Sequence, residues 1–189
     1  MTRKILASVA VVAALGSFSA VGVYSAFTKT TENDNNRIQA GTVNISDNDA
    51  NAALYSVVPA NGAKPGDFDE HCIKVTYTGS LPSNVKLYRT AVGALGTYVN
   101  LKIYKGTGSN FACSDFADTN GGTALYDNTL SGFGTDYTGG LALTNAAGSA
   151  TWATNDTVTY KVRGTLMNDD NAQGGDTNLH NFVWEAHNT

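Results

Sequence analysis

The sequence has 189 residues, of which 12 are basic and 16 are acidic, so its formal net charge at pH 7 is −4. A mildly acidic chain without Lys/Arg clusters argues against nucleic acid and anionic lipid as partners. Its 3 prolines, 20 glycines and 9 tyrosines disfavour long helices and favour short strands joined by tight turns. The composition therefore predicts an all-β fold.

The first 26 residues have the layout of a secretory signal peptide. Arg3 and Lys4 form a positive tip, and an uncharged apolar run follows from residue 5 to about residue 26. A run of this length also suits a retained membrane anchor. Small residues divide it into a short apolar core and a small-residue end, which favours cleavage, and residue type allows either Ala20 or Ala26 before the cut. We therefore expect an exported protein.

Removal of residues 1–26 leaves 189 − 26 = 163 residues, the size of one domain. Residues 27–37 carry a single apolar residue, at their start, and have too little apolar surface to fold alone. We predict a mobile N-terminal segment at residues 27–37 and one domain at residues 38–189.

Two cysteines, Cys72 and Cys113, lie in this exported region. Thiols oxidise outside the cell, so a single disulfide is favoured over two free thiols or a metal-binding pair. In the entropic model, closing a loop of about 40 residues restricts the unfolded chain by roughly 3–4 kcal/mol.

Alternation of apolar and polar residues predicts about eight to ten short strands. The segments that carry this pattern are residues 38–46, 54–58, 72–77, 85–90, 98–105, 156–166 and 179–186, with shorter ones at Leu125–Tyr126 and Leu141–Leu143. Within residues 156–166, Val158, Tyr160 and Val162 fall on one face. Short strands at roughly even spacing predict a two-sheet sandwich.

The histidines do not form a recognisable zinc motif. His71, His180 and His187 are scattered, and the chain contains no H-E-x-x-H sequence, which places two ligands and a carboxylate base on one helix face. Serine nucleophile elbows and phosphate-binding glycine loops are missing as well. We expect surface histidines, no catalytic residue and no cofactor.

A polar stretch near the C-terminus has part of a calcium-loop pattern. Oxygen-bearing side chains stand at alternate positions before a glycine, and the candidates are Asp169, Asn171 and Asp176. The twelfth position counted from Asp169 is, however, His180, where a bidentate Glu is required. A solvated loop is the favoured reading. A calcium site completed by distant residues stays open.

Several motifs resemble those of the TasA and camelysin (CalY) family of exported bacterial proteins. Signals in that family end in an aromatic-small-Ala-Phe junction, followed by (A/S)-G-T-(V/L)-(D/N)-(L/I). The matching segments here are Tyr24-Ser25-Ala26-Phe27-Thr28, Ala40-Gly41-Thr42-Val43-Asn44-Ile45-Ser46, the loop Pro65-Gly66-Asp67 before a pair of strands, and Phe182-Val183-Trp184-Glu185-Ala186 near the end. Residues 91–150 match no motif of the family.

The resemblance implies a jelly-roll sandwich and cleavage between Ala26 and Phe27 by a SipW-type signal peptidase. It also implies that the protein is a structural subunit of biofilm-matrix fibres, outside the cell or at its surface. The implied donor strand, which pairs with the next subunit, begins with Phe27, Thr28, Lys29, Thr30, Thr31, Glu32 and Asn33. A homo-oligomeric filament is thus the expected partner, with a cell-surface or accessory fibre protein as a further one.

The residues alone allow the same reading and others. An extended polar segment can pair with a sheet edge, and head-to-tail pairing that does not close gives filaments. The alternatives are an ordinary frayed terminus, a secreted metalloprotease of the camelysin type, and a monomeric carbohydrate-binding surface protein.

Overall fold

The computed structural model describes residues 37–189 except 51, 58, 60 and 61. The chain divides into two units, Met1–Gln39 and Ala40–Thr189. The predicted signal peptide, its cleavage site at Ala26 and Phe27, and residues 27–36 of the predicted mobile segment lie outside the described residues. Among the residues that are described, no helix has the length and apolar character needed to cross a membrane.

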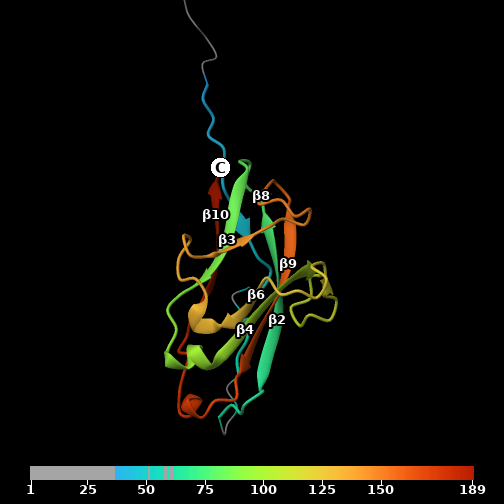
Figure 1. Cartoon of the computed structure of the whole chain (residues 1–189). Coiled ribbons are helices and arrows are strands. Elements are labelled where there is room, and N and C mark those ends of the chain that lie inside the picture. The colour runs from blue at the N-terminus through green and yellow to red at the C-terminus, as the bar shows by residue number, and fades with distance from the viewer. Residues whose placement is uncertain (1–36, 51, 58, 60–61) are drawn as a thin grey trace, which may run out of the picture. The chain divides into compact units, whose positions relative to one another are not determined.

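The unit Ala40–Thr189 is all β, as predicted, and two antiparallel sheets pack together as a sandwich (Figure 1). The larger sheet contains β1 (Ile45–Ser46), β2 (Phe68–Tyr77), β4 (Val99–Thr107), β5 (Ala117–Asp118), β6 (Tyr126–Thr129) and β9 (Thr157–Leu166). The smaller sheet contains β3 (Ser83–Arg89), β7 (Leu141–Leu143), β8 (Thr151–Trp152) and β10 (Phe182–Asn188). Short 3-10 helices lie between strands: η1 (Ala94–Tyr98), η2 (Leu130–Gly132) and η3 (Asp170–Ala172).

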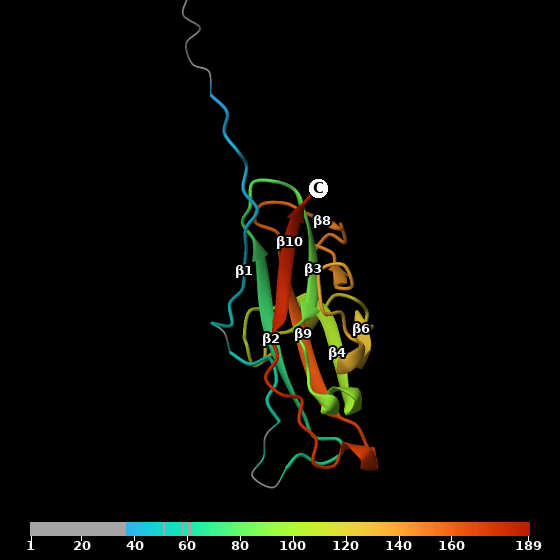
Figure 2. The same cartoon turned by 90° about the vertical axis from the view of Figure 1, so that its left-hand side faces the viewer.

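The larger sheet has the strand order β1-β2-β9-β4-β5, and β6 also pairs with β4. The smaller sheet has the order β10-β3-β7, and β8 also pairs with β3. The long strands β2, β9 and β4 therefore form the centre of one layer, and β3 forms the centre of the other. In Figure 2, β10 faces the viewer, with β3 to its right and β1 to its left.

The core lies between the inner faces of the two sheets, and the predicted alternation explains it. In β2, Ile73, Val75 and Tyr77 are buried against the other sheet, and the residues between them point to the outer face. In β9, Val158, Tyr160 and Val162, which the sequence predicts on one face, are buried as well. The alternate residues Val99, Leu101 and Ile103 of β4 are also buried. The largest fully buried side chains are Trp152, Tyr77, Tyr160, Ile73, Leu87, Leu101, Ile103, Leu130 and Leu143.

The predicted strand at residues 54–58 is wrong for the residues that the structure describes there. This stretch runs beside β2, but it bonds to side chains and not to a backbone ladder. The Ser56 N–H donates to Asp69 Oδ2 (2.8 Å), and the Leu54 carbonyl lies 3.3 Å from His71 Nδ1. The predicted strand at residues 38–46 is shorter than expected and contains only β1.

Burial predicts which leucines hold the sandwich together. Leu101 is 0% exposed, and Leu179 is 101% exposed. We expect Leu101→Ala to lower the free energy of unfolding by about 2–5 kcal/mol, because it leaves a cavity in the core. The same change at Leu179 should alter stability by no more than about 0.5 kcal/mol. Urea denaturation of the two variants measures the difference, and equal effects would contradict the described core.

Candidate strand-acceptor edge

The histidines predicted at the surface lie in three separate places. Each ring contacts another aromatic ring: His71 stacks on Phe111 (4.3 Å between centroids), His180 tilts against Tyr55 (5.6 Å) and His187 stacks on Tyr137 (3.7 Å). Within the described part of the chain, no group of three or more His, Cys, Asp or Glu side chains is arranged to hold a metal ion.

The calcium-loop candidates act in local turns. Asp169 Oδ1 accepts hydrogen bonds from the backbone N–H and the side-chain amide of Asn171, both at 2.9 Å, and so caps η3. Asp176 Oδ1 accepts a separate bond from the Asn178 N–H at 2.7 Å. The structure therefore brings Asp169 and Asn171 together and uses Asp176 in a different turn.

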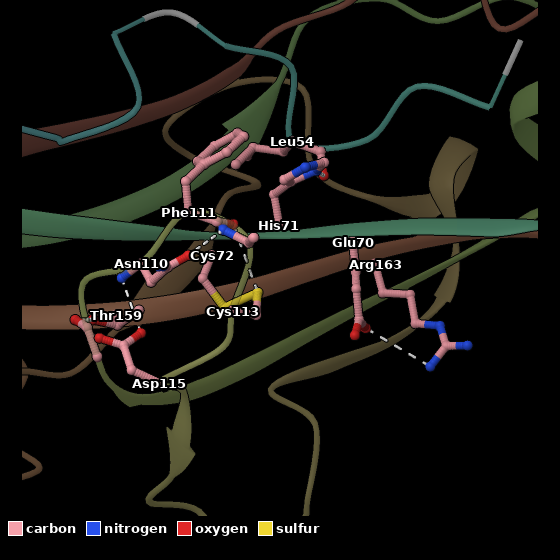
Figure 3. Close-up of a disulfide and its surroundings, with 12 residues drawn as sticks. Leu54, Glu70, His71, Cys72, Asn110, Phe111, Cys113, Asp115, Thr159 and Arg163 are labelled. Carbon is pink, nitrogen blue, oxygen red and sulfur yellow. Dashed lines mark hydrogen bonds and ion pairs between the residues drawn. A yellow bond between two sulfur atoms is a disulfide. The ribbon is translucent and has the colours of Figure 1, made fainter.

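The outer edge of β2 is closed by a disulfide-linked loop. Cys72 and Cys113 form the predicted disulfide, with their Cα atoms 5.1 Å apart. The loop after β4 lies over Thr159 of β9, whose hydroxyl donates to the Gly108 carbonyl (2.6 Å), and reaches β2 (Figure 3). There the Phe111 carbonyl accepts the Cys72 N–H at 2.8 Å.

The remaining outward N–H groups of β2 also have partners. Register places its even-numbered residues on the edge away from β9, since Tyr77 already bonds to residues on the β9 side. The outward donors and their acceptors are Glu70 with Asp69 Oδ1 (2.9 Å), Lys74 with Asn48 Oδ1 (2.7 Å) and Thr76 in the ladder with β1. From Glu70 to Thr76, this edge has no N–H left to offer a further strand.

The opposite edge of the larger sheet is covered too. β5 pairs with β4 at Gly106 and Thr107, and β6 pairs with β4 from Asn100 to Ile103. The Leu125 N–H adds a bond to the Ile103 carbonyl at 2.7 Å.

The edge of β10 is different. All 7 residues of β10 pair with β3 on one side. At its ends, Thr90 N–H donates to the Asn181 carbonyl (2.9 Å) and Thr189 N–H donates to the Pro82 carbonyl (3.1 Å). Because hydrogen-bonded pairs alternate in an antiparallel ladder, the odd-numbered residues of β10 bond to β3 and the even-numbered ones turn their N–H and C=O groups outward.

The outward backbone groups of β10 are therefore those of Phe182, Trp184, Ala186 and Asn188. Among the residues that the structure describes, none donates to or accepts from these groups. Unpaired N–H and C=O groups in a row are a template for another strand. β10 is thus an edge of strand length whose outward backbone groups are unpaired, and β1 lies close to part of it.

A groove runs beside the first half of this edge. Its volume is about 580 Å³, and it lies between residues 179–184 on one side and β1 with the segment that follows it to Leu54 on the other. Leu54 and Val75 are buried core residues that also line it, together with Phe182 and Trp184. The groove therefore gives access to the apolar interior between the two sheets.

Two polar features mark the groove. Its charged lining residues in the described region are Asp47 and Asp49, both acidic, and His180 lies opposite them and shares a 2.6 Å hydrogen bond with the Tyr55 hydroxyl. Burial, opposed by the nearby Arg89, raises the pKa of the Tyr55 phenol, which stays neutral. The buried indole N–H of Trp184 has no hydrogen-bond acceptor among the described residues.

Comparison with known proteins does not identify the chain, because no model of a known protein family matches it and no curated protein sequence is similar to it.

Sequence reasoning named a donor segment but not the edge that would receive it. The alternation of Phe182, Trp184 and Ala186 does predict a strand, and β10 is that strand. Whether β10 lies at an edge depends on which strands pair with it. The sequence of residues 179–188 alone does not determine that pairing. The asparagine that blocks β2, Asn48, belongs to what reads in sequence as an ordinary polar turn.

The disulfide should contribute to stability mainly by restricting the unfolded chain. It closes a loop with a sequence separation of 41. We expect the double change Cys72→Ser and Cys113→Ser to lower the free energy of unfolding by roughly 3–4 kcal/mol. Guanidinium unfolding tests this, and reduction of the parent protein should give the same loss. Unchanged stability in both experiments would contradict the assigned role.

Asp115 should make the same loop sensitive to acid. Hydrogen bonds from the backbone N–H of Asn110, and then from that of Ser109, hold the pKa of Asp115 below its ordinary value of 3.8. The stabilisation is present above pH 3.8 and is lost as pH falls through the lower folded-state value. Asp115→Asn should therefore lower the protection of the Asn110 amide against hydrogen exchange at neutral pH. It should also remove the loss of that protection in acid. Asp170→Asn should change neither property.

Proposed function

We propose that this protein is a structural subunit of extracellular, biofilm-matrix fibres. Copies assemble head to tail when the N-terminal segment of one subunit pairs with a sheet edge of the next. The observation that carries the proposal is the edge of β10, whose outward N–H and C=O groups have no partner within the described structure. An edge of 7 residues is long enough for stable strand addition.

The sequence supports residues 27–36 as the donated segment. They combine one aromatic residue, Phe27, with three β-favouring threonines, and they contain no proline or glycine that would interrupt a strand. Such a segment gains backbone hydrogen bonds by joining an existing sheet. The resemblance of the Ala26-Phe27 junction to TasA-type proteins supports the same role.

Donation from one end of a subunit to a different surface of the next is a heterologous contact. After each addition, the assembly still presents a vacant edge at one end and an unused N-terminal segment at the other. Growth therefore continues unless the geometry closes a ring, and an open filament results. No chemical step is needed, and the residues of the site act by pairing and packing.

The disulfide is consistent with a protein that works outside the cytoplasm, because thiols are kept reduced inside most cells. Export would follow from the predicted signal peptide, and filaments would reach the surface through an accessory protein or non-covalent contact. No observation on the described residues favours the secreted metalloprotease or the carbohydrate-binding protein. Chelator-sensitive proteolysis or saturable glycan binding by purified protein would identify them.

Deletion of residues 27–36 should separate folding from assembly. The buried core that the structure describes lies within Ala40–Thr189, so the shortened chain should keep its thermal unfolding midpoint. It should form no filaments, because the donated strand is missing. Negative-stain electron microscopy beside calorimetry measures both properties. Normal filaments from the shortened chain would rule out the proposed assembly.

A further inference from the structure

We propose that the acceptor of the donated segment is the edge of β10 with the groove beside it, here called the acceptor groove. Its occupant is residues 27–36 of a second copy of this chain, added as a strand along the outward groups of Phe182, Trp184 and Ala186. Lys29 of the incoming segment lies against Asp47. This assignment rests on the proposed function, and it states which surface and which side chains perform it.

The other long sheet edges are already occupied. On β2 every outward N–H from Glu70 to Thr76 already has an acceptor, and the disulfide-linked loop closes that edge (Figure 3). On β4 the short strands β5 and β6 occupy the outer side. On the far side of β3 the register is taken by β7 and β8. Within the described structure, β10 is the long edge that remains open.

Residues 27–36 match the edge and the groove in length and in side-chain chemistry. An extended strand rises about 3.4 Å per residue, so ten residues cover the 7 of β10 with some to spare. Side chains two apart share a face, which places Phe27 and Lys29 together. That face offers one aromatic ring and one positive charge to a groove with an apolar floor and two aspartates.

One buried hydrogen-bond donor beside the groove lacks an acceptor in the described structure. The Trp184 indole N–H is buried beside the groove without an acceptor in the described structure. Leaving such a buried donor unpaired destabilises the subunit, because the N–H has lost its hydrogen bond to water. A strand laid on β10 brings carbonyl groups to this side of the sandwich, and the hydroxyl of Thr31, which shares a face with Phe27 and Lys29, comes with them. An incoming strand can therefore satisfy a group that the subunit alone does not.

A neighbouring copy suits the groove better than the segment of the same chain. The Thr42 carbonyl accepts from the N–H groups of Ser80 (2.9 Å) and Leu81 (3.1 Å), and this holds the start of the unit beside the turn after β2. A segment that returned to its own groove would fill the edge and leave the protein monomeric, so the proposed filaments require the segment of a second copy.

Charge reversal tests the contact between copies. Lys29→Glu and Asp47→Lys, each made in the chain that begins at Phe27, should raise the critical concentration for filament formation about tenfold in low salt. The double variant should recover to within about threefold of the parent, because the opposite charges meet again. Asp170→Lys, an exposed aspartate outside the groove, should match the parent. The assignment would be overturned if the single variants assembled normally, or if the double variant assembled no better than the single variants.

Blocking the strand edge tests the backbone contact. Ala186→Pro removes one outward N–H and leaves the bonds to β3 in place, as proline does on natural edge strands. We expect a folded protein without filaments, whereas Asp170→Pro, at the exposed first position of η3 and outside the groove, should assemble. Filaments from the folded proline variant would contradict the assignment.

A trans experiment separates this inference from the proposed function. A chain lacking residues 27–36 can accept a strand but cannot donate one. When it makes up one part in ten of a mixture with the parent chain, it should cap the growing ends and shorten the filaments several-fold. The same chain carrying Asp47→Lys should cap far less. Equal capping by both would place the acceptor elsewhere while leaving strand donation intact. Persistent filaments from the shortened chain alone would instead remove the proposed function.

Discussion

The organisation of this protein depends on how the edges of its two sheets satisfy their backbone hydrogen-bonding groups. Buried or paired edges are inert, whereas a row of unpaired N–H and C=O groups is a binding surface for another strand. The β2 edge uses a side-chain amide, a loop carbonyl and the strand β1 to fill its outward positions. The β10 edge uses none of these in the described chain. In the proposed fibre, this difference between the two edges gives each subunit a direction.

The disulfide has a place in the same account. The loop that carries Cys113 crosses from β4 to β2 and presents the Phe111 carbonyl to the Cys72 N–H (Figure 3). Covalent attachment keeps this loop on the edge, and Asp115 stiffens it by accepting from the N–H groups of Ser109 and Asn110. A fibre subunit benefits from such closure because a second open edge would permit side-by-side pairing. In the proposed fibre, the cysteine pair would therefore protect the edge that must stay unpaired.

Much of the fold was predictable from the sequence, since alternation survives wherever a long strand is buried on one face. Ile73, Val75 and Tyr77, like Val158, Tyr160 and Val162, show their burial in their spacing. The two-residue strands β5 and β8 are too short to show a pattern. The stretch that begins at Leu54 resembles a strand in sequence because it contains apolar and β-branched residues. In the structure it bonds instead to the side chains of Asp69 and His71. The jelly-roll connection stays a prediction.

The acceptor groove could not be predicted, because its walls come from residues about 130 positions apart in sequence, such as Asp47 and His180. Only strand pairing shows that β10 is left at an edge. The most direct test of this account is the structure of the filament by electron cryomicroscopy. We expect residues 27–36 of one subunit to lie as a strand on the outward groups of Phe182, Trp184 and Ala186 of the next. A filament in which β10 faces solvent, or in which that segment pairs with another edge, would contradict it.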